Sequence, residues 1–295
     1  MSSDADPPRF DLQSHSTYSD GSLSPAEVVR AAAAAGVELL ALTDHDTVDG
    51  VAEALAAGPE AGVRVVPAAE ISARDREARR DLHILGYLLD TASTPLRETL
   101  ERSRTARARR GEAMIAALRE LGFEVDGAAL AERVAAGRAL GRPHLARAVA
   151  GRPENAARLR AEGIADASAF LEAYLIPGAP AFRPRQSPSV PEAIAAIHAA
   201  GGLAVWAHPF FDVENPAEVT AAIDRLAGHG LDGVECFYIT HTRSQTLLAA
   251  DHCTRRGLLT TGSADFHGPE SARFNRFRAF STYGRDPALG RIAAG

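Results

Sequence analysis

Short apolar runs alternate with alanine-rich amphipathic segments along the first ninety residues. Four of these runs have the length of strands and are bounded by turn-forming or polar residues: 9–15, 37–43, 63–69 and 81–88. Between the first two, Ser24 and Glu27 form a capping box with Pro25 at the first helical position, which predicts a helix start. A second helix is expected over 50–61. Strands that alternate with helices predict a parallel sheet or barrel.

The pattern changes between residues 95 and 180, where Arg, Ala, Glu and Leu recur at helical spacing and strand-like runs nearly disappear. A proline-containing segment then leads to a second capping box, Ser189 to Glu192. After it the alternation resumes, with strands expected at 202–207, 231–237 and 258–262 and helices at 217–226 and 244–255. We therefore expect one α/β barrel in two parts, 9–94 and 181–284, interrupted by a helical insertion over 95–180.

Composition and charge narrow the class of protein. The net charge of -6 argues against broad attraction to nucleic acid, and the absence of lysine excludes a P-loop and Schiff-base chemistry. No apolar run reaches the roughly 18 residues of a membrane helix, and the acidic start does not resemble a signal peptide. Cys236 and Cys253 are too few and too far apart for a disulfide framework or a cysteine zinc site. A cytoplasmic protein without membrane contact is expected.

Polar side chains with metal-binding chemistry follow the predicted strands. Five of the ten histidines lie just after or inside an apolar strand: His15, His45, His83, His208 and His267. Carboxylates accompany them at Asp20, Asp44, Glu70 and Asp265. A single histidine of this kind is more often structural than a metal ligand. Here, however, five successive strands each place a polar side chain of this kind at the same end. Because strand ends converge on one face of a barrel, we expect a single cleft suited to zinc, manganese or iron.

Six segments in order resemble the motifs of the PHP (polymerase and histidinol phosphatase) superfamily. Residues 11–16 with 19–21 resemble its first motif, and 43–47, 207–209 and 265–268 resemble the second, third and fourth; 69–72 and 81–83 fit its intervening ligand segments. The resemblance implies a PHP-type distorted (β/α)7 TIM-like barrel. The helical insertion and the Gly-Arg-Pro-His segment ending at His144 are similar to the nucleotide phosphoesterase branch. That branch removes phosphate from 3',5'-bisphosphorylated nucleotides or trims short RNA from the 5' end.

The same resemblance implies a cluster of two or three divalent ions, with manganese expected first and zinc, iron or magnesium as alternatives. Gln13, His15, Glu70 and Asp265 would hold one ion. Glu70 would bridge to a second ion, held by His83 and His208. Asp20, His45 and His267 would hold the third ion. A hydroxide formed on the cluster would attack phosphorus in line. Glu70, Asp20, Arg142 and His144 are the expected catalytic residues, and Arg183 and Arg185 are further candidates for phosphate binding.

Gln13 departs from the superfamily, which normally has histidine at this position. Residues 13 and 15 face the same side of a strand, so the register of the motif is kept. An amide oxygen is a harder, weaker and neutral ligand compared with imidazole. The first ion would therefore bind less tightly, prefer manganese or magnesium to zinc, or be absent.

Other functions remain open from the sequence. One alternative is an amidohydrolase, although that class often bridges its metals with a carboxylated lysine, which this chain lacks. Two further alternatives are a binding module in which Gln13 has weakened the metal site, and a histidinol-phosphate phosphatase. Arginines at 97, 102, 104, 107, 109 and 110 interleave with glutamates, which favours an intrahelical ion-pair face over an RNA site. Glu235 and His241 lie near a late strand without an assigned role. The expected partner is a nucleotide, another small phosphorylated compound or short RNA, bound by a monomer.

Overall fold

The computed structural model describes residues 8–135, 140–184 and 186–294. The chain divides into two compact units: unit 1 comprises residues 1–101 and 188–295, and unit 2 comprises residues 102–187. The sequence predicts a separate helical insertion domain over 95–180, and these domain boundaries stay a prediction. Within the described ranges, every helix is too short or too polar to cross a bilayer.

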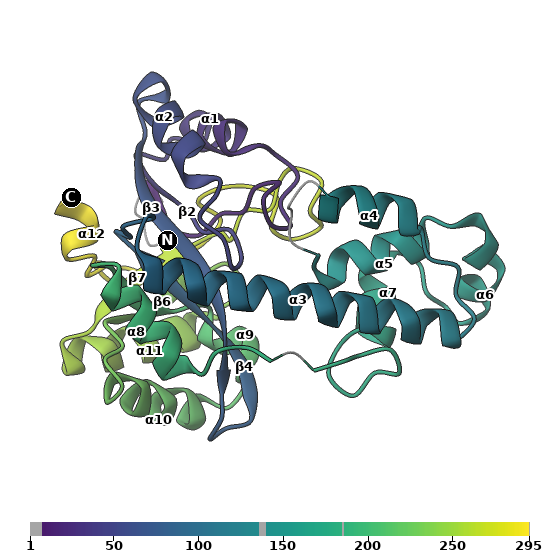
Figure 1. Cartoon of the computed structure of the whole chain (residues 1–295). Helices are drawn as coiled ribbons and strands as arrows, with labels where there is room; N and C mark the ends of the chain where they lie inside the picture. Colours follow the sequence, from purple (N-terminus) through teal and green to yellow (C-terminus); the bar gives the residue numbers. More distant parts are fainter. Residues whose placement is uncertain (1–7, 136–139, 185, 295) are drawn as a thin grey trace, which may run out of the picture. The chain divides into compact units, whose positions relative to one another are not determined.

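Unit 1 is built around a seven-stranded sheet whose spatial order follows the sequence (Figure 1). The strands are β1 (Phe10–Asp11), β2 (Leu39–Leu42), β3 (Arg64–Asp75), β4 (Arg80–Tyr87), β5 (Leu203–Trp206), β6 (Gly233–Tyr238) and β7 (Leu259–Ser263). The first and last strands approach each other, since Leu12 N donates to Gly262 O at 3.2 Å and Ser14 bridges to Phe266. The sheet therefore nearly closes, and the expected barrel-like α/β architecture is confirmed.

The sheet is mixed, which corrects the expectation of parallel strands. β4 runs antiparallel to both β3 and β5, whereas the other neighbouring pairs are parallel. Only residues 76–79 separate β3 from β4. A parallel return needs a crossover of about a dozen residues or more, so a connection this short permits only an antiparallel pair.

Helices cover the sheet in two groups (Figure 1). Helices α1 (Pro25–Ala34) and α2 (Val51–Ala61) pack together and against β2 and β3. Helices α8 (Val190–Ala199), α10 (Pro216–Ala227) and α11 (Arg243–Arg256) cover β4 to β7. Both expected capping boxes are confirmed, because Ser24 and Ser189 accept from the backbone of Glu27 and Glu192, whose carboxylates accept from the cap residues in return. Two short helices, α9 (Pro209–Asp212) and α12 (Arg291–Ala294), complete unit 1.

The interior of unit 1 is apolar below the strand ends. Trp206, Tyr87 and Phe237 are among its largest fully buried side chains, and the Tyr87 hydroxyl donates to Leu12 O at 2.9 Å. The two cysteines meet in this core with their sulfurs 3.9 Å apart. That distance is well above the roughly 2 Å of a disulfide bond, so both are thiols.

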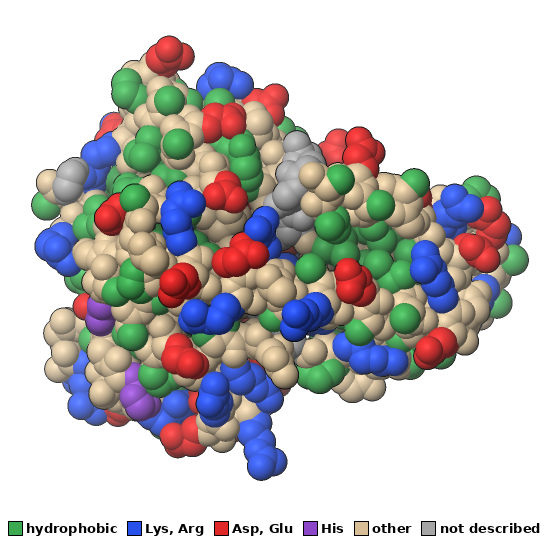
Figure 2. All heavy atoms as spheres, viewed as in Figure 1, with side chains coloured by type: hydrophobic (Ala, Val, Ile, Leu, Met, Phe, Trp, Pro, Cys, Tyr) green, Lys and Arg blue, Asp and Glu red, His purple; other side chains and the backbone are tan. Residues whose placement is uncertain are grey.

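Unit 2 is helical and has a core of its own. Helix α3 (Thr94–Glu120) starts in unit 1 and continues into unit 2, where it is followed by α4 (Gly127–Ala135), α5 (Arg142–Ala150), η1 (Pro153–Asn155), α6 (Ala156–Ala161) and α7 (Ala167–Tyr174). Phe123, Phe170 and Tyr174 pack ring against ring with centroids 4.8 to 5.1 Å apart. Basic and acidic side chains are interspersed on the face of the molecule shown in Figure 2. The ion-pair face expected along α3 stays a prediction.

Candidate metal centre

The strand ends of unit 1 deliver the expected ligands to one place. Gln13 and His15 follow β1, His45 follows β2, and Glu70 and His83 lie within β3 and β4. The remaining members come from later strands and from the loop after β1: His208, Asp265, His267 and Asp20. Contacts below 4 Å connect all nine of these side chains. The structure therefore brings together every residue proposed as a metal ligand from the sequence.

Glu70 is the centre of this arrangement. Its Oε1 faces His83 Nδ1 at 2.6 Å and His208 Nε2 at 3.3 Å. Its Oε2 faces the Nε2 of His15 and the Nδ1 of His45, both at 3.2 Å. Burial of the carboxyl would raise the pKa of Glu70, but the electrostatic interaction with the imidazoles of His45 and His83, with hydrogen bonds from His15 and His208, outweighs it and holds the pKa well below the usual value. Each carboxylate oxygen thus serves a different pair of imidazoles.

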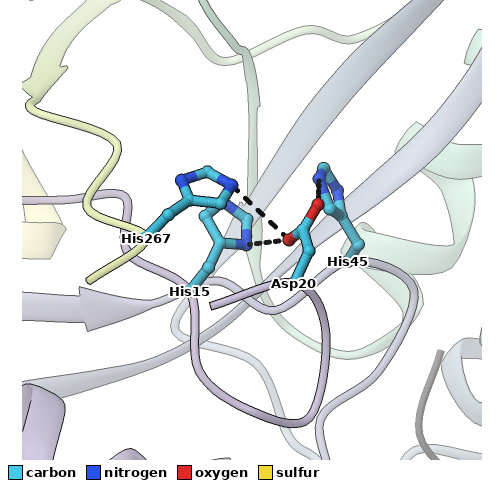
Figure 3. Close-up of side chains that lie close together, drawn as sticks. All are labelled: His15, Asp20, His45 and His267. Carbon is cyan, nitrogen blue, oxygen red and sulfur yellow. Dashed lines mark ion pairs between the residues drawn. The ribbon is translucent and has the colours of Figure 1, made fainter. Parts of the chain in front are cut away.

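A second group surrounds Asp20, as Figure 3 shows. Asp20 Oδ1 lies 3.4 Å from His267 Nε2 and 3.8 Å from His15 Nδ1, and Oδ2 lies 3.7 Å from His45 Nε2. One ligand atom from each of the four residues falls within 4.8 Å of the others. The pKa of Asp20 is lowered well below its usual value because His45 and His267 overcome the effect of burial.

Several polar atoms at this centre are buried without a hydrogen bond: His15 Nε2, Asp20 Oδ1, His45 Nδ1 and Asp265 Oδ1. Folded proteins satisfy nearly all such atoms, and each one left without a partner costs about 1–3 kcal/mol. A divalent cation among them would provide the missing partner. Imidazole nitrogen with carboxylate oxygen suits zinc, manganese and iron alike, so the residues present fit a metal centre without fixing the ion or the number of ions.

The backbone is strained where two of these residues leave their strands. His208 and Asp265 have φ of 31° and 53°, in the left-handed region that costs non-glycine residues about 1 kcal/mol or more. His208 is fixed there by its N–H, which donates to Glu235 Oε2 at 2.9 Å. Asp265 is fixed by the Tyr238 hydroxyl, which donates to Oδ2 at 2.8 Å. Both side chains are thereby turned into the centre.

Of the residues that position the ligands, the sequence pointed only to Glu235, without a role. Asp212 Oδ2 lies 3.5 Å from His208 Nδ1, on the side of the ring opposite Glu70, and its spacing of four from His208 was the available signal. Glu235 accepts from Ser263 Oγ at 2.6 Å as well as from His208 N, and burial raises the pKa of this carboxyl to about 8. Tyr238 and Ser263 carry no signal in the sequence, because only the closed sheet brings β6 and β7 to these contacts.

Asp44 lies beside the centre without joining it. Its carboxylate accepts from Ser16 N at 2.7 Å and from the hydroxyls of Ser16 and Ser19. These bonds hold the loop that carries Asp20. Asp46 does the same for β3, accepting from Ser72 N at 2.9 Å. Within the second sequence motif, His45 alone therefore faces the cluster.

The expected phosphate-binding residues belong to unit 2. Arg142 and His144 open α5, and His144 Nδ1 accepts from Gly141 N at 3.0 Å. Arg183 Nη1 donates to Phe182 O at 2.8 Å, and Arg185 lies outside the described residues. Their part in phosphate binding stays a prediction.

Comparisons with known proteins agree with this centre. Residues 11–128 match the family model of the PHP domain. A 3',5'-nucleoside bisphosphate phosphatase of Chromobacterium violaceum is 33% identical over 88% of this chain and 87% of its own. A 5'-3' exoribonuclease of Haemophilus influenzae is 32% identical over 88% of this chain and 90% of its own.

A solved structure extends the similarity to the whole fold. It is assigned as a metal-dependent phosphoesterase of Bifidobacterium adolescentis and superposes with a TM-score of 0.79 at 27% identity, covering 98% of this chain and 96% of its own. Sequence relatives, fold and the buried histidine and carboxylate clusters all point the same way. The chain belongs to the PHP family of metal-dependent phosphoesterases.

Proposed function

We propose that this chain hydrolyses phosphate monoesters of nucleotides, with 3',5'-bisphosphonucleotides as its first substrate, and that it also cleaves the phosphodiester bonds of short RNA from the 5' end. The observation that carries the proposal is the double-sided contact of Glu70. Oε1 faces His83 and His208, whereas Oε2 faces His15 and His45. A buried carboxylate between two sets of imidazoles is suited to bridge two cations, because it places negative charge between them.

Two or three divalent ions, manganese first, would be held by this chain's residues. Glu70 with His83 and His208 would hold one ion. Asp20 with His45 and His267 would hold another. His15, Asp265 and Glu70 would hold a third, beside Gln13, whose NH₂ group donates to Glu70. When bound, such ions polarise phosphoryl oxygens and lower the pKa of a coordinated water toward neutrality.

The protein's own residues fix the geometry. Tyr238 orients Asp265, Glu235 holds the strained backbone of His208, and Asp44 fixes the loop of Asp20. Arg142 and His144 are proposed to contact the phosphate, because a guanidinium offers paired donors to phosphate oxygens. The low pKa values of Glu70 and Asp20 keep both carboxylates charged at neutral pH, as cation binding requires.

The relatives support nucleotides over histidinol phosphate. Two relatives that align along most of this chain are named for a nucleoside bisphosphate and for RNA. The experiment that tests the proposal measures phosphate release from adenosine 3',5'-bisphosphate by metal-stripped protein to which manganese, zinc or magnesium has been added back. Metal-dependent release that exceeds release from histidinol phosphate is the expected result. Preference for histidinol phosphate, or no release with any ion from folded protein, would overturn the proposal.

Glu70→Ala tests the bridge itself. Because two cations share this carboxylate, the variant should lose phosphate release and more than one ion per chain, measured by elemental analysis. Glu60→Ala is the matched control, since Glu60 is an exposed glutamate of α2 in the same unit. Full activity in Glu70→Ala would contradict the bridging role.

A further inference from the structure

Three aromatic rings form a row along one side of the metal centre. Phe211 lies in α9, Tyr238 ends β6, and Phe274 lies in the loop after β7. The ring centroids of Phe211 and Tyr238 are 6.5 Å apart, and those of Tyr238 and Phe274 are 6.3 Å apart. These distances are within the range in which aromatic rings interact. We call Phe211, Tyr238 and Phe274 the aromatic row.

Both ends of the aromatic row touch proposed metal ligands. Phe211 packs edge-on against His208 with centroids 5.5 Å apart. Phe274 lies at the same distance from His267, and His267 N donates to Phe274 O at 2.8 Å. The row therefore runs from one proposed ligand to another. A molecule whose phosphate reached the centre would have its remaining atoms within reach of these rings.

Phe211 is far more exposed than its neighbour. Its exposed fraction is 53%, the highest among the exposed large hydrophobic residues that the structure describes, whereas Phe210 is 8% exposed and packs on His241. Phe210 and Phe211 point in different directions because they are successive residues of α9, whose first turn is closed by Phe211 N donating to its cap residue, His208 O, at 2.8 Å. A single exposed apolar ring is ordinary on a protein surface. This ring differs because it adjoins the proposed metal ligand His208 and the ring of Tyr238, which in turn contacts Phe274.

Tyr238 and Phe274 back the exposed ring. Tyr238 is 3% exposed and its hydroxyl donates to Asp265, so the ring cannot swing outward without losing that bond. Phe274 is half-buried, and its carbonyl is fixed by His267. In the aromatic row, Phe211 is therefore exposed to a ligand, whereas Tyr238 and Phe274 are held in place by hydrogen bonds. A preorganised aromatic surface of this kind loses little entropy when a flat ligand binds.

We propose that the aromatic row is a nucleobase-binding site, with Phe211 as the stacking residue. The inference rests on the proposed nucleotide phosphoesterase activity and names the part of the substrate that this surface binds. Every base has a π-face, and stacking on an aromatic side chain is worth roughly 5- to 150-fold in affinity per base. Since stacking does not read base edges, the site should tolerate different bases rather than select one.

The experiment compares a nucleotide with a substrate that lacks a base. Phosphate release is measured from adenosine 3',5'-bisphosphate and from methyl riboside 3,5-bisphosphate, using manganese-loaded wild-type protein, Phe211→Ala and Phe211→Trp. In Phe211→Ala the ratio of kcat/KM for the nucleotide to kcat/KM for the abasic substrate should fall roughly 5- to 150-fold. Phe211→Trp should keep the wild-type ratio, because tryptophan also stacks. Leu55→Ala, which removes an exposed apolar side chain from α2, is the control.

The outcomes separate this inference from the proposed function. An equal loss on both substrates in Phe211→Ala would overturn base binding, because it would show a general effect on the centre. If wild-type protein released phosphate from neither compound, the proposed function would fail by itself. Calorimetric binding of adenosine 3',5'-bisphosphate would then decide the inference: weaker binding to Phe211→Ala than to wild type would support it, and equal or absent binding would overturn it.

Discussion

The side-chain amide of Gln13 donates to Glu70 Oε2 at 3.1 Å, and its oxygen faces the hydroxyl of Ser263 at 3.5 Å. Gln13 thus presents its NH₂ group, which cannot bind a cation, to the carboxylate at the centre of the site. A histidine here would offer an imidazole nitrogen instead. The hydrogen bond of Gln13 satisfies the same lone pairs of Glu70 that a cation would use on this side.

Gln13→His is therefore expected to strengthen metal binding. The variant restores an imidazole beside His15 and Asp265, so zinc content after dialysis should rise by about one ion per chain. Elemental analysis of wild-type protein and variant measures this directly. Gln186→His places a histidine at an exposed site and should leave the metal content as it is. Equal zinc content in wild type and Gln13→His would show that Gln13 does not limit the first site.

Asp212→Asn tests whether the Asp212 carboxylate orients the ring of His208 through its Nδ1 atom. Asp212 lies 3.5 Å from the His208 nitrogen that faces away from Glu70, and a carboxylate there favours the tautomer that directs a lone pair into the centre. Loss of such a partner typically weakens metal affinity about 10- to 100-fold. Competition with a chelator of known affinity gives the change. Glu214→Gln, an exposed neighbour, is the control, and an unchanged affinity in Asp212→Asn would remove Asp212 from the site.

Local signals in the sequence predicted most of the frame. Ser24 and Ser189 start their helices as expected, because a capping box depends on residues three apart. The five histidines, Glu70 and Asp265 were proposed because they follow or lie in apolar strands whose ends converge. Gln13 and the grouping of the ligands were proposed from the resemblance to the superfamily. The antiparallel course of β4 was missed, since apolar runs carry no direction. Tyr238 was missed as well, because its contact with Asp265 depends on the pairing of β6 with β7.

Protonation of His241 should destabilise the folded protein at acidic pH. Its Nε2 accepts from Phe210 N at 3.3 Å and its Nδ1 donates to Cys236 O at 3.1 Å, so the ring is neutral. Burial lowers the pKa of His241 to about 4, against 6.5 for an unperturbed histidine. Between pH 6.5 and 4 the His241 ring is protonated in the unfolded chain but stays neutral in the folded chain. The free energy of unfolding therefore falls as the pH decreases from 6.5 to 4.

The size of this effect is at most about 3.5 kcal/mol, at about 1.4 kcal/mol for each unit of pKa difference. Urea unfolding of wild type and His241→Asn at several pH values measures it. The difference in unfolding free energy between the two proteins should change steadily across this window. A constant difference from pH 6.5 to 4 would show that His241 titrates normally in the folded protein.

Phe170→Ala should loosen unit 2 while unit 1 keeps its metals. Phe170 is fully buried, with its ring 5.1 Å from that of Phe123 and 4.9 Å from that of Tyr174. Removing such a ring typically costs about 3–5 kcal/mol, a large fraction of the stability of a small helical unit. Limited proteolysis should therefore cut the variant within residues 102–187 sooner than wild type. Ile176→Ala, which trims an exposed side chain of the same unit, should be cut at the wild-type rate.

Metal content separates the roles of the two units in this variant. All nine proposed ligands lie in unit 1, so Phe170→Ala should retain the wild-type number of ions. Arg142 and His144 lie in unit 2, so the KM for adenosine 3',5'-bisphosphate should rise as that unit loosens. A loss of metal together with unit 2 would mean that the insertion supports the cluster itself. An unchanged KM in a visibly loosened protein would remove Arg142 and His144 from phosphate binding and leave recognition of the substrate to unit 1.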